Sequence, residues 1–526
     1  MVPTRRNIFP SLPTTAAVVA LLCWDPWRLC VWTGTSAYAW VAAPGCHDRP
    51  TQRRLSTTTT TDSGPFHTVQ DALDFVDDVL RNEEAATEQT EDDMIQRVDA
   101  LHAADVEAAA QSPLISSRDC YNTNEYATVP SFERVHVGDT TSSTVVVRST
   151  DPMLTPQEVA TIRTAADAVW ARSSTDSTGA VTSRFTHQYP GNSEAHVSDL
   201  SDEAVAVVNR ALAQTIYPLV SAAFSDEATE DLCVYDALVI RYNATGGTAS
   251  AGAGQPLHRD LGAVSVNLQL SSQFTGGGTL FEQQLGDEDA TIVRPLHPKG
   301  VGYGLAHRST DRHAGAATIQ GVRDILVLFL LPIPSTPGLR SARWMQCREY
   351  CGSENVLCRI RHQRLAVQAM DHQPQPYGQA HHYLGSALRD YAALQQHDEH
   401  RKLALLQAAI ACFRHAATLS PYDARIYNDW GIAARGSGST DDDDERLFRH
   451  AYNIVRQSAA AGCNVEHDMD RIALNLGLCL ADQDQFAAAA AVLEPTAAAC
   501  QQDATSSRTV QDAARLWSFC QRQQQS

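Results

Sequence analysis

The sequence lacks any concentration of positive charge. It has 41 lysine and arginine residues against 61 aspartate and glutamate residues, and its net charge is -20 at pH 7. Proteins that bind nucleic acid neutralise phosphates with clustered basic side chains, so we expect no nucleic-acid partner. The acidic excess favours solubility and does not identify a partner.

The sequence also lacks an uninterrupted apolar run long enough to cross a membrane. Two apolar runs, 14–24 and 29–43, lie near the N-terminus, and Asp25 and Arg28 lie between them. A transmembrane helix needs about 20 consecutive apolar residues. We therefore expect no stable membrane span.

The same region predicts a targeting leader. Arg5 and Arg6 precede the first apolar run, and the Ala-Tyr-Ala sequence at 37–39 is typical of a signal-peptidase site. We expect residues 1–39 to be a signal peptide or targeting leader that directs the protein to the secretory pathway, to the endoplasmic reticulum lumen or out of the cell. The alternatives are an organelle reached through a bipartite leader and a membrane anchor.

Cysteines are few and odd in number. With 13 cysteines, at least one is free, pairs with another chain or is lost with the leader. Cys347, Cys351 and Cys358 lie in residues 334–375, which we expect to be a cysteine-containing linker. An oxidising compartment favours a disulfide among them. A zinc site that includes His362 is the alternative, although it lacks a fourth ligand at regular spacing.

The length of 526 residues allows two or three domains. Residues 40–140 predict a low-complexity and helical N-terminal region, because a threonine run at 57–61 precedes apolar residues at helical spacing between 66 and 111. A dimerising coiled coil is the alternative for the helical part, although its heptads are not sustained.

Residues 141–333 have the pattern of an α+β domain. A β-branched strand at 144–147 precedes two helices, one that starts with the capping box Thr155 to Glu158 and one over 202–223. Short strand candidates follow at 238–242, 263–271, 279–281, 292–296, 302–306, 316–319 and 323–331. Short strands with a turn about every ten residues predict a double-stranded β-helix, or jelly roll, supported by the two helices.

Two histidines and a carboxylate in this block predict a metal site. His258 and Asp260 are two residues apart on an extended segment, so their side chains point the same way. His313 lies 55 residues further on, in another strand candidate. This ligand set is typical of mononuclear iron(II) oxygenases and leaves positions open for a co-substrate and dioxygen. His307 and His297 are rival distal ligands.

Arg323 follows His313 by ten residues and shares a face of its strand with Ile325 and Val327. An inward arginine needs an anion, because burying it unpaired costs several kcal/mol. A dicarboxylate co-substrate can supply that anion through a bidentate pair. A salt bridge with Asp324 or another acid is the alternative.

Between Val145 and Pro332 the chain resembles the prolyl 4-hydroxylase group of 2-oxoglutarate-dependent oxygenases. The matching elements are Arg241-Tyr242, His258-x-Asp260, Phe274-x-Gly276-Gly277-x-Thr279-x-Phe281, and His313 followed by Gly321 and Arg323. The resemblance implies that iron(II) binds His258, Asp260 and His313, which are then the catalytic residues. It implies that Arg323 and Tyr242 bind 2-oxoglutarate, and that L-ascorbate serves as a reductant.

The resemblance also implies the reaction. A dioxygenase of this group uses dioxygen, converts 2-oxoglutarate to succinate and carbon dioxide, and hydroxylates a peptidyl residue; proline is the expected one, as for procollagen-proline 4-dioxygenases. Arg323 departs from the lysine of animal collagen prolyl 4-hydroxylases, and arginine is usual in lysyl and prolyl 3-hydroxylases. A lysyl or small-molecule hydroxylase is therefore the alternative. Asn243 begins a glycosylation sequon beside the site, which we expect to be unused.

Residues 376–520 predict helical repeats. Gly385, Gly431 and Gly477 are 46 residues apart, and an alanine-rich helix candidate follows each of them. With Phe413, Ala416 and Pro421 in fitting places, the region resembles tetratricopeptide repeats (TPR). Stacked helical repeats form concave surfaces that suit extended peptides, so we expect a peptide or protein substrate. The alternatives are a scaffold or dimer interface, and a non-catalytic adaptor in which the repeats are the working part.

Overall fold

The structure is a computed structural model. It describes residues 66, 68–84, 96, 100, 103, 112–122, 129–137, 144–173, 192–224, 232–244, 254–260, 262–282, 295–332, 356–371, 378–438, 444–463, 465–502 and 507–525. The predicted leader, the threonine run, Cys347 and Cys351 lie outside these residues. The leader and the disulfide therefore stay predictions.

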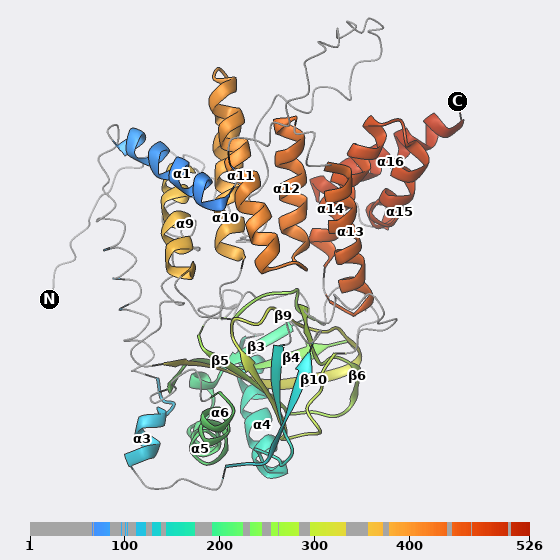
Figure 1. The fold of residues 1–526 in the computed structure, drawn as a ribbon. Helices are drawn as coiled ribbons and strands as arrows, with labels where there is room; N and C mark the ends of the chain where they lie inside the picture. Colours follow the sequence, from blue (N-terminus) through green and yellow to red (C-terminus); the bar gives the residue numbers. More distant parts are fainter. Residues whose placement is uncertain are drawn as a thin grey trace, which may run out of the picture. The chain divides into compact units, whose positions relative to one another are not determined.

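The described strands form one large and one small antiparallel sheet (Figure 1). The large sheet has the order β1-β2-β8-β5-β10-β4-β3, and β6 pairs with β10 beside this path. Its strands are β1 (Phe132–Val137), β2 (Thr144–Ser149), β3 (Asn192–His196), β4 (Leu232–Asn243), β5 (Val264–Gln269), β6 (Phe274–Gly276), β8 (Gly304–Arg308) and β10 (Thr318–Pro332). The small sheet pairs β7 (Thr279–Phe281) with β9 (His313–Gly315). The predicted mixture of helices and sheet is confirmed.

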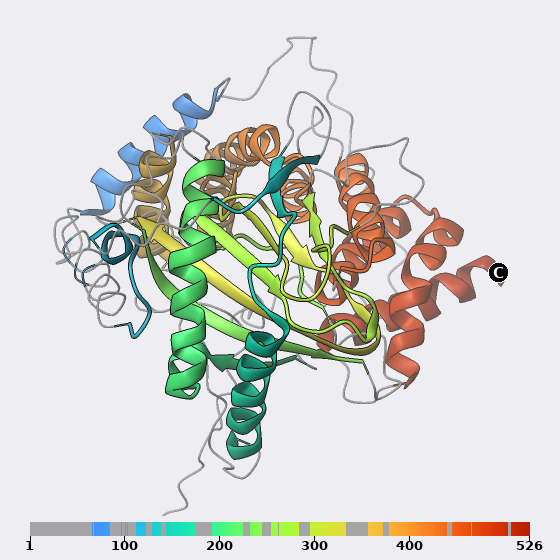
Figure 2. The ribbon, with the colours of Figure 1, turned by 90° about the horizontal axis from the view of Figure 1, so that it is seen from below.

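Helices cover one face of the large sheet, as Figure 2 shows. They are α3 (Ser117–Asn122), α4 (Pro156–Ser173), α5 (Asp202–Ala211) and α6 (Tyr217–Ala223), with a π-helical turn at Leu212–Ile216. The capping box before α4 is confirmed. The Thr155 N–H donates to Glu158 Oε2 at 2.7 Å, and the Glu158 N–H donates to Thr155 Oγ1 at 3.4 Å.

Strand β10 lies inside the large sheet, between β5 and β4, and its two faces meet different environments. Because side chains alternate along a strand, Leu326, Leu328 and Leu330 face the helices and join the largest core cluster around the sheet. Ile325 and Val327 face the other way and line a pocket. The same alternation places Arg323 in that pocket.

The remaining helices form an all-α region. They are α1 (Val69–Glu84), α9 (Val356–Asp371), α10 (Gln379–Leu394), α11 (Glu399–Leu419), α12 (Ala424–Ser437), α13 (Asp444–Ala460), α14 (Glu466–Asp482), α15 (Phe486–Gln502) and α16 (Arg508–Gln525). Successive helices from α9 to α16 pack against one another (Figure 1). No helix of the described segments is long and apolar enough to cross a membrane.

Two elements of this all-α region differ from expectation. Helix α9 lies in the predicted linker, and α1 lies in the predicted N-terminal region, yet both share one core with α10 and α11. Arg364 of α9 makes a bidentate pair with Asp77 of α1 at 2.9 and 3.0 Å. Cys358 is buried on α9, and its Sγ lies 3.3 Å from Nδ1 of His362.

The three repeat glycines have one structural role. Each lies in the first helix of a pair, where an added Cβ would meet a large side chain of the second helix. The Cβ would lie 2.8 Å from the Phe413 ring at Gly385, 2.7 Å from the Phe448 ring at Gly431 and 2.8 Å from Leu493 at Gly477. The internal repeat is thus a repeat of close helix–helix approach. Its membership of the TPR family stays a prediction.

Candidate metal centre

A short backbone bridge brings the two predicted histidine ligands side by side. The His258 N–H donates to the His313 carbonyl at 2.8 Å, and the His313 N–H donates to the His258 carbonyl at 2.9 Å. His313 belongs to β9. The Asp260 N–H donates to the Ser309 carbonyl at 3.1 Å, and this bond fixes the backbone of the segment that carries His258 and Asp260. His258 and His313, which are 55 residues apart in the sequence, therefore lie side by side in the structure.

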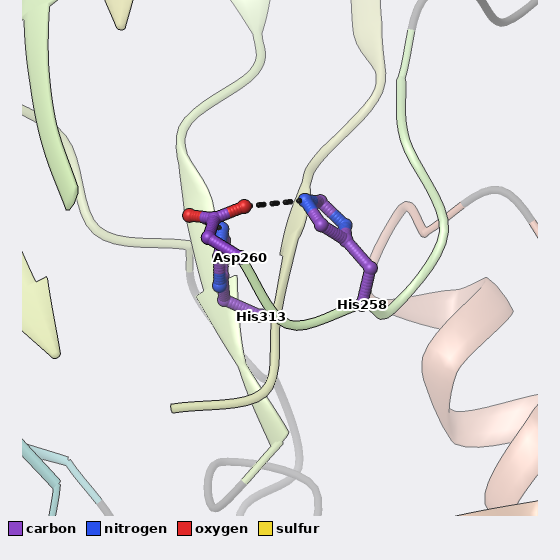
Figure 3. A group of neighbouring side chains, drawn as sticks. All are labelled: His258, Asp260 and His313. Atoms are coloured by element: carbon purple, nitrogen blue, oxygen red, sulfur yellow. Dashed lines mark ion pairs between the residues drawn. The ribbon is translucent and has the colours of Figure 1, made fainter. Parts of the chain in front are cut away.

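The three side chains point toward one another (Figure 3). The Asp260 carboxylate lies 3.4 Å from His258 Nε2 through one oxygen and 3.4 Å from His313 Nε2 through the other. One donor atom from each residue lies within 4.8 Å of the other two. Donors bound about 2.1 Å from one ion lie roughly 3 Å apart when they meet at right angles. The group fits a divalent metal ion after a small contraction.

Hydrogen bonds fix which nitrogen each histidine presents. His258 Nδ1 lies 2.8 Å from the Pro256 carbonyl, and His313 Nδ1 lies 3.0 Å from the Asp311 carbonyl. A carbonyl only accepts, so each Nδ1 donates, and each Nε2 keeps its lone pair for a metal.

The carboxylate is also oriented by a neighbour. The Ser265 hydroxyl on β5 donates to Asp260 Oδ2 at 2.6 Å, and its oxygen lies 3.0 Å from the Ser309 hydroxyl. Ser265 and Ser309 are both completely buried. This pair of hydroxyls holds the carboxylate in one rotamer.

The electrostatics favour the ligand forms of Asp260 and His313. Burial raises the pKa of Asp260, but the His313 and His258 imidazoles outweigh burial and hold that pKa well below its usual value. Burial lowers the pKa of His313 to about 3. Burial also lowers the pKa of His258, but the Asp260 carboxylate outweighs it and raises this pKa. An ionised aspartate and neutral histidines are what metal binding requires.

Arg323 is the second feature of the pocket. It is 2% exposed, and its Nε and Nη1 find no hydrogen-bond partner among the described residues. Its guanidinium carbon lies 5.1 Å from the ring centroid of Tyr242, the residue opposite it on β4. Burial lowers the pKa of Arg323. A buried cation with unused donors calls for an anion in the pocket.

The alternative prediction, a salt bridge between Arg323 and Asp324, is wrong. Asp324 points to the helix side of β10, where Arg241 Nε donates to it at 2.7 Å and Arg163 Nε at 2.9 Å. Adjacent residues of a strand face opposite sides of the sheet. The acid next to Arg323 in the sequence is therefore unable to neutralise it.

The glycine-rich turn makes room for Arg323. Gly277 has φ +72°, and a Cβ there would lie 2.7 Å from Cδ of Arg323. Only glycine adopts this backbone conformation without strain and allows such a close approach. Gly277 of the Gly-Gly motif thus leaves free the space that the Arg323 side chain occupies.

Metal ligands and arginine line one pocket, which holds about 420 Å³ of empty space including its open mouth. Its walls are Ile240, Tyr242, Gln255, His258, Asp260, Asn267, Thr279, His313, Gly315, Arg323, Ile325, Val327 and Phe329. Gln255 and Asn267 are polar members that sequence reasoning did not single out, and Thr279 was named there only as part of the glycine-rich motif. The sequence contains a signal that could have identified Asn267. It is a polar residue inside an apolar strand, on the same face as Ser265.

The two rival histidines lie nearby without joining the metal-binding group. His307 is completely buried, and its ring centroid lies 4.3 Å from that of His313, edge to face. Its Nδ1 donates to the Arg308 carbonyl at 2.9 Å. His297 lies close to the turn glycine Gly278; burial and the Arg323 cation lower its pKa.

Comparisons with known proteins add distant similarities. No family model and no curated protein match the chain. AviO1 from Streptomyces viridochromogenes Tue57 is 17% identical over 37% of this chain and 92% of its own, with a TM-score of 0.27. The non-heme α-ketoglutarate-dependent epimerase SnoN from nogalamycin biosynthesis is 15% identical over 38% of this chain and 77% of its own, with a TM-score of 0.25.

A third similar structure is the viral collagen prolyl hydroxylase of Paramecium Bursaria Chlorella virus-1 in complex with 2OG. It is 12% identical over 38% of this chain and 94% of its own, with a TM-score of 0.23. Similar structures thus include 2-oxoglutarate-dependent Fe(II) oxygenases and prolyl hydroxylases. Because these TM-scores are low, we argue the function from the side chains of the pocket.

Proposed function

We propose that the protein is an Fe(II)- and 2-oxoglutarate-dependent dioxygenase. The observation that carries this proposal is the buried guanidinium of Arg323, which has no ion-pair partner in the described part of the chain and lies in the same pocket as His258, Asp260 and His313. The triad offers the ligand set of a mononuclear iron(II) site. Arg323 offers a bidentate donor for the far carboxylate of a dicarboxylate.

Each residue of this chain then has a defined task. His258, Asp260 and His313 would hold iron(II), and Arg323 with Tyr242 would bind 2-oxoglutarate. Iron(II), 2-oxoglutarate and dioxygen together supply an oxidative decarboxylation that yields succinate and carbon dioxide and hydroxylates a C–H bond of the substrate. The apolar walls of β4 and β10 exclude water and strengthen the charge pairing with Arg323. L-Ascorbate is the proposed reductant.

We propose a double-stranded β-helix for the strand-rich part of residues 141–333. Support comes from β10, which pairs with β6 near its start and with β4 and β5 further on. The small sheet of β7 and β9 contributes His313 and Thr279 to the pocket that β10 lines. Strands of both sheets thus border one ligand site, which is how a small jelly roll holds a ligand.

We propose a peptidyl residue as the substrate, with proline first and a lysyl or small-molecule substrate as the alternative. Support for a peptide comes from the all-α region, whose repeated helix pairs form the kind of array that binds extended peptides. The intact metal-binding group disfavours a non-catalytic adaptor. The secretory pathway is the proposed location, and it rests on the leader sequence alone.

The proposal is tested by succinate release from the purified protein with iron(II), 2-oxoglutarate and ascorbate. Poly-proline peptides, lysine-containing peptides and no peptide are compared, and mass spectrometry locates the added oxygen. We expect peptide-stimulated succinate release that His258→Ala abolishes. His136→Ala, at an exposed histidine on β1, is the matched control and keeps activity. Wild-type protein that neither binds iron(II) nor consumes 2-oxoglutarate contradicts the proposal.

A further inference from the structure

Two arginines flank the metal ligands in the sequence and point away from the metal-binding group. Arg259 lies between His258 and Asp260, and Arg312 directly precedes His313. Their side chains are 8% and 5% exposed. On an extended backbone, neighbouring side chains face opposite sides. Each arginine is thus the direct neighbour of a metal ligand in the chain, so a shift of the arginine moves the ligand's backbone.

Each arginine has a partner in the all-α region besides its partners in the strand-rich part, where Arg259 Nε donates to the Thr310 carbonyl at 3.0 Å. Arg312 Nη1 donates to Glu282 Oε1 at 2.7 Å, and its Nη2 lies 3.3 Å from Asp423 Oδ1. Arg259 Nη2 donates to the Ser420 hydroxyl at 3.1 Å. Ser420 and Asp423 belong to the turn between α11 and α12. Arg259 and Arg312, which flank the metal ligands, are therefore held in part by side chains of the turn between α11 and α12.

Asp423 is itself rigidly placed. Its side chain is 1% exposed, and the Arg425 guanidinium holds it with bonds of 2.9 and 2.8 Å. Burial raises the pKa of Asp423, but Arg312 and Arg425 outweigh burial and hold that pKa far below its usual value. A fixed, ionised carboxylate therefore faces Arg312.

A second turn of the all-α region touches the small sheet directly. Gly462, in the turn after α13, accepts a hydrogen bond from the Ala317 N–H at 2.7 Å. Ala461 and Cys463 of this turn share an apolar cluster with Leu280 of β7 and Ala314 of β9. The strand that carries His313 thus packs against the turn between α13 and α14.

We infer that the all-α region is part of the metal centre, and that Asp423 is a positioning residue for its ligands. This inference rests on the proposed function. Two effects act together: Asp423 fixes the strand of His313 through Arg312, and its carboxylate offsets the positive charge of that arginine, which directly precedes His313. Without Asp423, Arg312 keeps only its pair with Glu282, so its positive charge is less well offset near the metal ligands and the strand of His313 loses one of the two carboxylates that anchor it through Arg312.

The experiment measures cobalt(II) binding to the full-length chain, with the ligand-field spectrum reporting the geometry around the metal. Asp423→Asn is compared with Asp429→Asn. Asp429 is a matched control, since it is also buried and ionised but pairs with His382 at 2.9 Å and Arg389 at 3.1 Å within the all-α region. Loss of an outer partner of a metal ligand costs about 10- to 100-fold in affinity.

We expect Asp423→Asn to weaken cobalt(II) binding about tenfold and to change the spectrum, while Asp429→Asn matches the wild type. Unchanged binding by Asp423→Asn overturns the inference, and so does equal weakening by both variants. If circular dichroism shows that Asp423→Asn is unfolded, Ser420→Ala replaces it under the same criteria, because it removes the Arg259 contact and leaves every charge in place.

Failure of the proposed function looks different. In that case His258→Ala binds cobalt(II) as the wild type does, so no variant at Asp423 has a metal site to disturb, and the inference falls with the function. If the wild type binds cobalt(II) at His258, Asp260 and His313 but consumes no 2-oxoglutarate, only the proposed reaction is contradicted, and the metal site remains. The comparison of Asp423 with Asp429 then still decides the positioning role.

Discussion

At the scale of single residues, Arg323 and Asp324 show how one step along a strand changes a side chain's role. Arg323 enters the pocket with unused donors, and Asp324 enters the opposite core with two guanidiniums. The first is poised for a ligand, and the second is satisfied within the fold. Their substitutions are therefore expected to have opposite effects on stability.

Replacing Arg323 is expected to stabilise the protein in the absence of ligand. Arg323→Met keeps an unbranched side chain that spans the aliphatic part of the arginine, and it removes a buried cation whose unpaired donors cost about 1–3 kcal/mol. Thermal unfolding without 2-oxoglutarate should show a higher midpoint, and the rise that 2-oxoglutarate gives the wild type should disappear. Exposed Arg134→Met is the control, with no change in either respect. A lower midpoint for Arg323→Met would show that the arginine has an internal partner.

Replacing Asp324 is expected to destabilise the protein. Asp324→Asn leaves Arg241 and Arg163 without their buried carboxylate, which costs about 3–5 kcal/mol for a buried pair. Asp167→Asn is the matched control, since Asp167 pairs with the same Arg241 at 2.8 Å but its side chain is 55% exposed; its cost should stay below about 1 kcal/mol. Urea denaturation measures both, and equal costs would refute the distinction.

His196 gives a pH dependence. Its Nδ1 lies 3.0 Å from Asp236 Oδ1, and this contact, which outweighs burial, raises the pKa of His196. Folding then favours the protonated form. The stabilisation is complete below the ordinary histidine pKa of about 6.5 and is lost as the pH rises through the folded-state pKa. The stability lost in His196→Asn should be larger at pH 5 than at pH 8.5 in urea denaturation. A loss that is the same at both pH values contradicts the assignment, and exposed His136→Asn supplies the baseline.

At the scale of elements, much of the strand-rich part was predictable because its signals are local. Alternation, the Thr155 to Glu158 capping box and the Gly-Gly turn each fix a few residues. The predicted strand at 323–331 lies within β10, which also takes in the second half of the strand predicted separately at 316–319. The metal-binding group was predictable because its ligand types are few and its spacing is fixed. The partner of Asp324 was not, since Arg163 lies 161 residues away on a helix.

Helix α9 shows the limit of local signals. Its basic residues suggest a solvated segment, yet Arg359 and Arg364 are covered because Asp390 of α10 and Asp77 of α1 pair with them at 2.9 Å. A linker was expected from the prolines that flank this segment and from its cysteines, and the acids that neutralise the helix come from other elements. Charge pairing across long sequence separations decides such burial, and no window of the sequence contains both partners.

The repeat glycines offer a paired test within α12. Gly431→Ala forces a Cβ to 2.7 Å from the Phe448 ring, and overpacking of this kind costs about 1–3 kcal/mol. Gly436→Ala places its Cβ no closer than 3.4 Å to Leu406, so it should stabilise the helix by up to about 1 kcal/mol. Chemical denaturation compares the two. A shared sign of the change would contradict the proposed packing role.

At the scale of the whole molecule, sheet and helices depend on each other. Removing residues 376–526 should prevent formation of the metal site, because it exposes Leu280 and Ala314 and leaves Arg312 without Asp423. Ending the chain after 502 is the control, since α16 packs on α14 and α15. The measurement is the cobalt(II) spectrum of each soluble product. A normal spectrum from the shorter chain would establish an independent catalytic domain.

The pairing of α1 with α9 has a consequence for biosynthesis. Asp77 leaves the ribosome 287 residues before its partner Arg364, and at typical translation speeds that interval lasts about 15–60 s. Throughout it, the apolar side of α1 has no permanent neighbour, while the entire strand-rich part emerges behind it. The order of synthesis therefore leaves α1 uncovered until α9 and α11, the helices it packs against, have been made.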